Sequence, residues 1–171
     1  NDEGILMLGD KGSGKSTFLY ELSKRGRTKL IANTHVLIDD NGQAAGIYSS
    51  INYRKKIAEL IKGEVPELSN KVINSCTNID PDVLGFEKLN SIGISKIVFY
   101  NHNENEQLII NQIDKRNALQ LMRIYAYGIN VYGLRSDLLN VMENNVDRVI
   151  TKLDSDAKIM ENLVNKCEIY S

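Results

Sequence analysis

The feature that most constrains this chain is a glycine-rich segment, residues 9–17, which reads Gly-Asp-Lys-Gly-Ser-Gly-Lys-Ser-Thr. It fits the pattern G-x-x-x-x-G-K-[ST], in which a loop binds phosphate groups. Glycines let backbone N–H groups curl around phosphate oxygens without Cβ clashes, and a following helix directs its positive end at the same anion. An apolar run, residues 4–9, precedes the pattern, and a helical pattern, residues 15–25, follows it. We call residues 9–17 the phosphate loop and predict that it binds a nucleoside triphosphate.

The polar residues of the phosphate loop have distinct expected tasks. Lys15 is expected to reach the β- and γ-phosphates and to act as a catalytic residue by stabilising negative charge, and the Ser16 hydroxyl is expected to bind Mg²⁺, the predicted cofactor. The predicted nucleotide-binding residues of the loop are Gly9, Asp10, Lys11, Gly12, Ser13, Gly14, Lys15, Ser16 and Thr17. The alternative, a glycine-rich turn with an incidental lysine, explains neither the strand before the loop nor the helix after it.

A second candidate segment, residues 39–43, reads Asp-Asp-Asn-Gly-Gln and follows a short apolar run, residues 36–38. In one interpretation Asp39 holds Mg²⁺ through water, the Gly42 N–H contacts the γ-phosphate, and Gln43 is a catalytic residue that orients an attacking water. In the other, Asn-Gly is the turn of a β-hairpin that returns through residues 44–48, and the aspartates are solvated turn residues. The sequence leaves both interpretations open.

Other residues compete for the metal-binding role. Thr34 is a candidate for a loop threonine that closes over Mg²⁺ and the γ-phosphate, and Thr28 is the other option. Glu104, which follows the predicted strand at residues 96–100, is the weaker alternative to Asp39 as the acidic group.

Apolar runs alternate with helical patterns along the chain, which is typical of an α/β fold with a mainly parallel sheet. The length of 171 residues suits a single domain over residues 1–171, with a variable insertion at about residues 64–92 that holds a short helix near 84–89. The predicted strands lie at residues 4–9, 36–38, 96–100, 129–132 and 166–170, and the predicted helices at 15–25, 53–61, 106–127 and 154–166.

Composition excludes several classes of partner and site. Lys and Arg total 21 against 22 Asp and Glu, a balance that argues against a general nucleic-acid binder. No apolar run approaches the roughly 18 residues that a membrane span needs. The two cysteines and two histidines are isolated, which disfavours a zinc site or a disulfide framework and favours a cytoplasmic protein.

With these residues placed, the chain resembles a small Ras-like GTPase domain. The phosphate loop opens the chain, residues 39–43 resemble the family's D-x-x-G-Q, and residues 133–138 (Gly-Leu-Arg-Ser-Asp-Leu) lie where the family has G-N-K-x-D-L. The resemblance implies a P-loop NTPase fold, a three-layer sandwich with a mainly parallel central sheet. It also implies that Asp137 and Arg135 contact guanine, although Leu134 departs from the family's asparagine. The family's final helix would lie beyond Ser171, so a protein partner or a further domain is expected to cover one side of the sheet.

A second resemblance is to bacterial thymidine kinases. Residues 132–137 (Tyr-Gly-Leu-Arg-Ser-Asp) look like that family's Y-G-L-R-T-D segment. That family carries D-E-x-Q-F on the strand that corresponds to residues 96–100, and this sequence lacks the motif. Asn101 and His102 stand near the place of the family's acidic pair. The family's zinc-binding cysteine set is also absent, since Cys167 is alone. Three functions therefore remain: a GTP-binding switch with Mg²⁺-dependent hydrolysis, a nucleoside kinase that transfers phosphate from ATP, and a non-catalytic interaction module.

Overall fold

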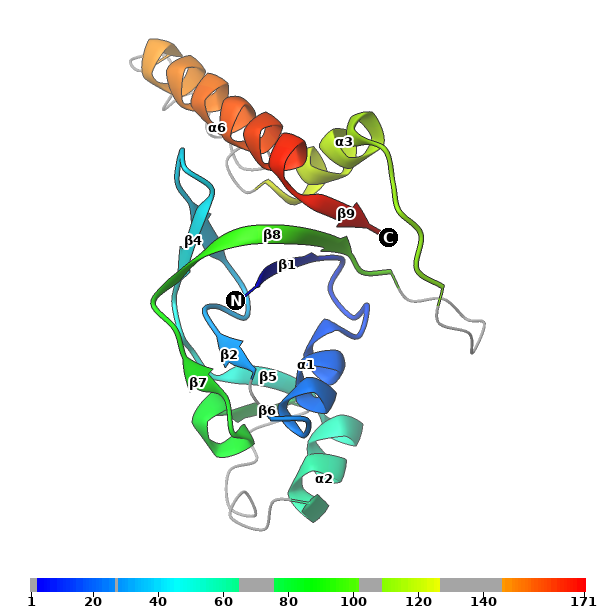
Figure 1. The fold of residues 1–171 in the computed structure, drawn as a ribbon. Coiled ribbons are helices and arrows are strands. Elements are labelled where there is room, and N and C mark those ends of the chain that lie inside the picture. Colours follow the sequence, from blue (N-terminus) through cyan, green and yellow to red (C-terminus); the bar gives the residue numbers. More distant parts are fainter. Residues whose placement is uncertain (1–2, 27, 65–75, 102–108, 127–145) are drawn as a thin grey trace. The chain divides into compact units, whose positions relative to one another are not determined.

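The computed structural model describes residues 3–26, 28–64, 76–101, 109–126 and 146–171 (Figure 1). It contains helices, a five-stranded sheet with parallel pairs, and two two-stranded sheets, one parallel and one antiparallel. The described chain divides into two compact units: residues 1–13, 38–43 and 93–171 form the first, and residues 14–37 and 44–92 form the second. The predicted α/β character is present, whereas the three-layer sandwich remains a prediction.

The first unit is built on a long strand, β8 (Ser91–Phe99), whose two edges are both paired. On one edge β1 (Gly4–Leu8) runs parallel to it in the register Gly4↔Ile94 to Leu8↔Phe99. On the other edge β9 (Glu168–Tyr170) is also parallel, and its Ile169 pairs with Ile97. Ile97 is completely buried between these two neighbours. The predicted strands at residues 4–9, 96–100 and 166–170 are thus confirmed as a parallel group.

Residues 111 and 113 form further backbone hydrogen bonds with residues 171 and 169, beside β9. The N–H and carbonyl groups of Asn111 and Ser171 bond reciprocally at 2.8 Å, and the Ile113 N–H donates to the Ile169 carbonyl at 3.1 Å. Residues 111–113 therefore pair as extended backbone, and the helix predicted at 106–127 is wrong over residues 109–114, whereas residues 106–108 and 127 lie outside the described residues. The helix α3 (Lys115–Tyr125) begins where Asp114 accepts the N–H groups of Arg116 and Asn117, both at 3.0 Å.

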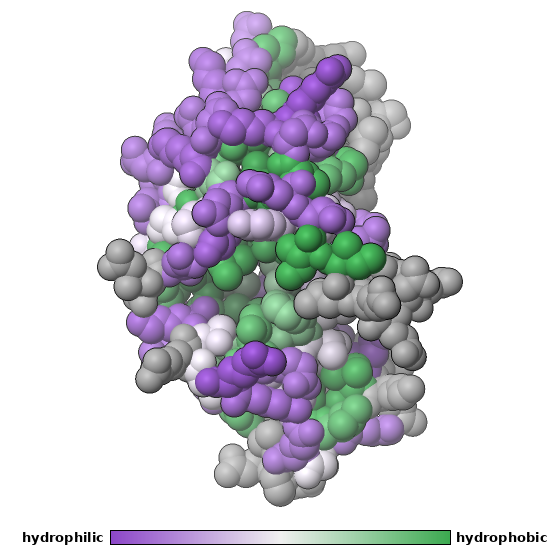
Figure 2. All heavy atoms as spheres, turned by 45° about the vertical axis from the view of Figure 1, so that its right-hand side comes forward, coloured by the Kyte–Doolittle hydropathy of each residue, from purple (hydrophilic) through white to green (hydrophobic). Residues whose placement is uncertain are grey.

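The helices α3 and α6 (Val146–Lys166) pack against each other (Figure 1). Buried Ala118 and Met122 of α3 and buried Met160, Leu163 and Val164 of α6 supply their apolar faces. In the second view, hydrophilic side chains cover most of the upper region where these helices lie (Figure 2). The predicted helix at 154–166 is confirmed and is longer at its start.

The second unit contains α1 (Lys15–Ser23), α2 (Lys55–Glu64) and two small sheets. The strand β2 (Lys29–Leu30) pairs with β7 (Glu87–Lys88), and β5 (Ile51–Arg54) pairs with β6 (Cys76–Ile79). A 3₁₀ turn, η2 (Pro81–Leu84), precedes β7. The expected helix near 84–89 is therefore a strand preceded by a 3₁₀ turn. The helix predicted at 53–61 begins only at Lys55, because Tyr53 pairs with Thr77 in β5.

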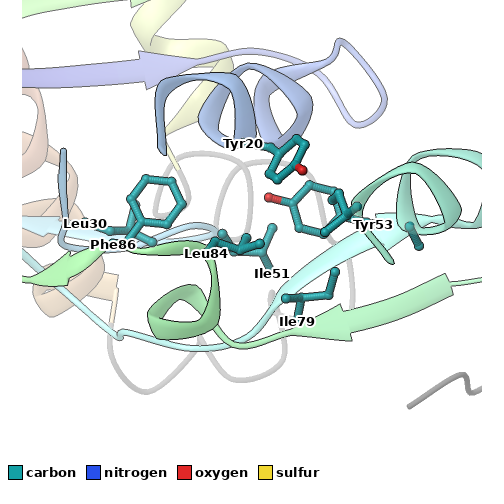
Figure 3. Close-up of a cluster of buried hydrophobic side chains, with 9 residues drawn as sticks. Tyr20, Leu30, Ile51, Tyr53, Ile79, Leu84 and Phe86 are labelled. Atoms are coloured by element: carbon teal, nitrogen blue, oxygen red, sulfur yellow. The ribbon is translucent and has the colours of Figure 1, made fainter. Parts of the chain in front are cut away.

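The core of the second unit gathers under α1 (Figure 3). Tyr20 of α1 meets Tyr53 of β5 edge-on, with ring centroids 6.4 Å apart. The Tyr20 hydroxyl bonds to the Glu64 carboxylate, whereas the Tyr53 hydroxyl is buried with no hydrogen-bond partner among the described residues. Burial raises the pKa of Tyr53 well above its ordinary value. The remaining buried members are Leu30, Ile51, Ala58, Ile61, Ile79, Leu84 and Phe86.

Removal of the Tyr53 hydroxyl tests this core. We expect Tyr53→Phe to leave the free energy of unfolding unchanged or to raise it by about 1 kcal/mol, because a buried hydroxyl without a partner carries a desolvation cost. Tyr20→Phe, the matched control, should lower the free energy of unfolding by about 1 kcal/mol, since it removes a bonded hydroxyl. Urea unfolding of both variants measures the difference. A loss of more than about 1 kcal/mol in Tyr53→Phe would show that a buried water or another group bonds this hydroxyl.

Candidate functional site

The phosphate loop begins where β1 ends, beside the end of β8. The Tyr100 N–H donates to the Leu8 carbonyl at 2.6 Å, which holds the last residues of the two strands together. A Cβ atom on Gly9 would overlap the carbonyl oxygen of Tyr100. Glycine is therefore required at the first loop position for a packing reason, in addition to the conformational freedom that the sequence pattern suggests.

Residues 9–13, which belong to the first unit, form a tight turn. The Ser13 N–H donates to the Asp10 carbonyl at 3.2 Å, and Ser13 is 7% exposed. Gly12 has a φ of 92°, in the region that side chains disfavour. Asp10, Lys11 and Gly12 are exposed to solvent.

Residues 14–17 begin the second unit and start α1. Gly14 is the N-cap residue at a φ of 101°, and its carbonyl accepts the Phe18 N–H at 2.9 Å as the first helical bond. Neither a side-chain cap nor an acidic residue occupies the first turn of α1. The partial positive charge of the helix start is thus not opposed there by a carboxylate. Lys15, Ser16 and Thr17 lie in this first turn and are half-buried.

Residues 39–43 form the turn of a β-hairpin between β3 (Val36–Ile38) and β4 (Gln43–Gly46). The Asp39 N–H donates to the Gln43 carbonyl at 3.0 Å, and Asp39 Oδ1 accepts the N–H groups of Asn41 and Gln43 at 2.9 and 2.8 Å. Gly42 has a φ of 79°, as an Asn-Gly hairpin turn requires. Of the two interpretations that the sequence left open, the hairpin is the one that the structure contains.

This hairpin turn lies at the end of β8 remote from the phosphate loop. The Ile94 N–H donates to the Gly42 carbonyl at 3.1 Å, and the Gln43 side-chain amide lies against Gly93. Ile94 also pairs with Gly4, the first residue of β1, so the turn is level with the beginning of that strand. Five residues of strand, about 16 Å, separate this level from Gly9. The structure therefore does not bring Asp39, Gly42 and Gln43 to residues 9–13, as their predicted roles require.

The remaining predicted site residues lie elsewhere. Thr34 is exposed in the second unit, and Thr28 donates its hydroxyl to the Leu22 carbonyl at 3.3 Å, in the connection after α1. Arg135, Asp137 and Glu104 lie outside the described residues, so their predicted roles rest on the sequence alone.

The structure places the hydroxyl of Tyr125, a residue that was not among the predicted site residues, at the phosphate loop. The hydroxyl lies 3.5 Å from Asp10 Oδ1, and the ring packs on Phe99 with centroids 6.3 Å apart. Burial, with a further contribution from the Asp10 charge, raises the pKa of Tyr125. Tyr125 is the last residue of α3, and helical periodicity gives no signal for a contact with a residue so distant in the sequence.

The described residues contain no cluster of three or more His, Cys, Asp or Glu side chains arranged to hold a metal ion. For Mg²⁺, the Ser16 hydroxyl is an oxygen donor of the kind that this ion prefers. The Asp39 carboxylate does not fit the same role, because Oδ1 already accepts two N–H groups and the turn lies far from Gly9. None of the described helices combines the length and apolar character of a membrane span.

Comparisons of the chain with models of protein families, with curated proteins and with solved structures give no match.

The contact between Gly9 and Tyr100 gives a direct test of the loop's packing. We expect Gly9→Ala to lower the free energy of unfolding by about 2 kcal/mol, because the new Cβ meets a backbone oxygen that cannot move without shifting β8. Gly63→Ala, in α2 with nothing within 4 Å of the added Cβ, should instead raise stability by about 0.5–1 kcal/mol. Thermal or urea unfolding checks both. Equal effects of the two changes would contradict the close approach.

Proposed function

We propose that this chain binds a nucleoside triphosphate through residues 9–17. The observation that carries the proposal is the strand, loop and helix sequence in which Gly12 and Gly14 both adopt positive φ values and α1 starts without an acidic side chain. Such a backbone supports successive N–H groups around an anion at a helix start. Lys15 adds the positive charge that the β- and γ-phosphates require.

Magnesium is the proposed cofactor, and Ser16 is the residue that would hold it. When bound, Mg²⁺ neutralises charge on the β- and γ-phosphate oxygens. Lys15 and the loop amides would bind and orient the same phosphates. In this proposal Asp39 is not a ligand of the ion, because its carboxylate accepts two N–H groups of its own turn.

Guanine is the proposed base, on the sequence resemblance of residues 133–138 to the guanine-reading motif. In that proposal Asp137 accepts hydrogen bonds from the guanine ring and the Arg135 stem packs on it. We also propose, from the sequence, a cytoplasmic location and a protein partner or further domain that covers the sheet.

A nucleoside kinase is the second candidate function, and one observation favours it. Hydrolysis by a Ras-like mechanism needs a water-positioning residue at the phosphates, whereas Gln43 lies against Gly93 at the other end of β8. Phosphate transfer from ATP to a nucleoside does not depend on the hairpin turn. A binding module without turnover is also compatible with the position of Gln43.

Nucleotide-dependent thermal unfolding tests the proposed binding. With Mg²⁺ and GTP at about 100 times the Kd, we expect the Tm to rise by about 5 °C or more. Lys15→Ala should remove this shift and leave the Tm without nucleotide unchanged. Lys158→Ala, which removes an exposed charge on α6, is the matched control and should keep the full shift. If GTP, ATP and tripolyphosphate all fail to stabilise the unmodified chain at millimolar concentration, the proposal is wrong.

A comparison of nucleotides separates the candidate functions. The GTP proposal requires a larger shift with GTP than with ATP, and Asp137→Ala should weaken GTP binding about tenfold while ATP binding is kept. A shift with ATP alone, increased by added thymidine, would support the kinase instead. Equal losses for GTP and ATP in Asp137→Ala would contradict the role of this residue in reading the base.

A further inference from the structure

The phosphate loop carries an acidic residue, Asp10, at its second position, where the proposed ligand is a polyanion. Asp10 is exposed, and its carbonyl already fixes the loop turn by accepting the Ser13 N–H. A carboxylate within a few ångströms of a triphosphate weakens binding by charge repulsion, unless its charge is partly compensated and its side chain is held. The hydroxyl of Tyr125 is placed to contribute to this, because it lies within hydrogen-bond distance of Asp10 Oδ1.

Tyr125 is held in place by the packing of its ring and by the packing of its helix. Its ring lies on Phe99, the last residue of β8, with an interplanar angle of 33°. Its helix, α3, is fixed at the start by the Asp114 cap and along its length by α6. The hydroxyl at the outer end of this ring lies 3.5 Å from Asp10 Oδ1. Since β8 also holds Gly9 through Tyr100, the same strand positions both the loop and the ring that supports Tyr125.

We propose that Tyr125 is a positioning residue of the phosphate loop, whose hydroxyl holds the Asp10 carboxylate and offsets part of its charge so that the loop accepts a polyphosphate. This inference rests on the proposed function. Tyr125 acts through Asp10 and does not itself contact the ligand. The consequence is that the hydroxyl matters for binding only while residue 10 carries a negative charge.

Tyr125→Phe isolates the hydroxyl because it keeps the ring that packs on Phe99. We expect this variant to bind Mg²⁺–GTP and tripolyphosphate about threefold to tenfold more weakly, as the loss of one hydrogen bond to a charged group implies. The Tm without ligand should not change. Because the effect is electrostatic, the weakening should be larger at 20 mM than at about 300 mM salt, a dependence that a packing defect would not show.

A double-mutant cycle with Asp10→Asn decides whether Tyr125 acts through Asp10. Asp10→Asn alone should bind the polyphosphate more tightly, because it removes a negative charge close to the ligand. Tyr125→Phe should then have no further effect in the Asp10→Asn background, which measures the coupling between the two residues. Tyr170→Phe is the matched control, because it removes a tyrosine hydroxyl that bonds to Glu168 at 2.9 Å, and it should bind normally.

The outcomes separate this inference from the proposed function. If the unmodified chain binds and Lys15→Ala does not, but Tyr125→Phe binds normally, the role of Tyr125 is wrong and the phosphate loop stands. Equal weakening by Tyr125→Phe with and without Asp10→Asn would also overturn the inference, since the hydroxyl would then act on something other than Asp10. If the unmodified chain binds neither GTP, ATP nor tripolyphosphate in isothermal titration, both proposals are overturned.

Discussion

The parallel pairing of β1 with β8 is the interaction on which the candidate site depends. It ends with the Tyr100 N–H bonded to the Leu8 carbonyl and with Gly9 against the Tyr100 carbonyl oxygen, a separation that leaves no room for a Cβ. The chain must leave the sheet at this point, and it does so through a turn that only glycine-rich backbone can form. The same strand end carries Phe99, which supports Tyr125. The carboxyl end of β8 thus positions both the start of the phosphate loop and Tyr125, the side chain that contacts Asp10.

The direction of β8 also separates two segments that looked like parts of one site. Parallel strands place their carboxyl ends together, and ligands of such sheets bind at that edge. Residues 9–13 follow the carboxyl end of β1, whereas the turn at residues 39–43 lies level with the amino end of the same strand. Nucleotide binding by residues 9–17 does not require that turn. The Ras-like catalytic set does require it, because Gln43 would have to lie at the phosphates. The position of the turn therefore leaves the proposal of nucleotide binding unaffected and argues against hydrolysis assisted by Gln43.

Short-range sequence patterns correctly predicted the apolar strands and the helix after the phosphate loop. The runs at residues 4–9, 96–100 and 166–170 are apolar enough to form buried strands, and a helix follows the phosphate loop as its pattern requires. The same approach failed where pairing overrode periodicity. Tyr53 reads as helical but belongs to β5, and residues 111–113 read as helical but pair with β9. In both places backbone hydrogen bonds to a distant segment gave a lower free energy than an isolated helical turn, and no window of neighbouring residues contains that information.

The sequence alone determined the glycine, lysine and hydroxyl pattern of residues 9–17 and the balanced charge of the chain, because these are properties of residue types and spacing. It also admitted the hairpin at residues 39–43 without choosing it. Tertiary structure decided that choice, through the two N–H groups bonded to Asp39 and the pairing of Gly42 with Ile94. It also decided that Tyr125, 115 residues from Asp10, meets the loop. Contacts between residues so far apart depend on which strands pair and in which register, and neither is encoded in any single segment.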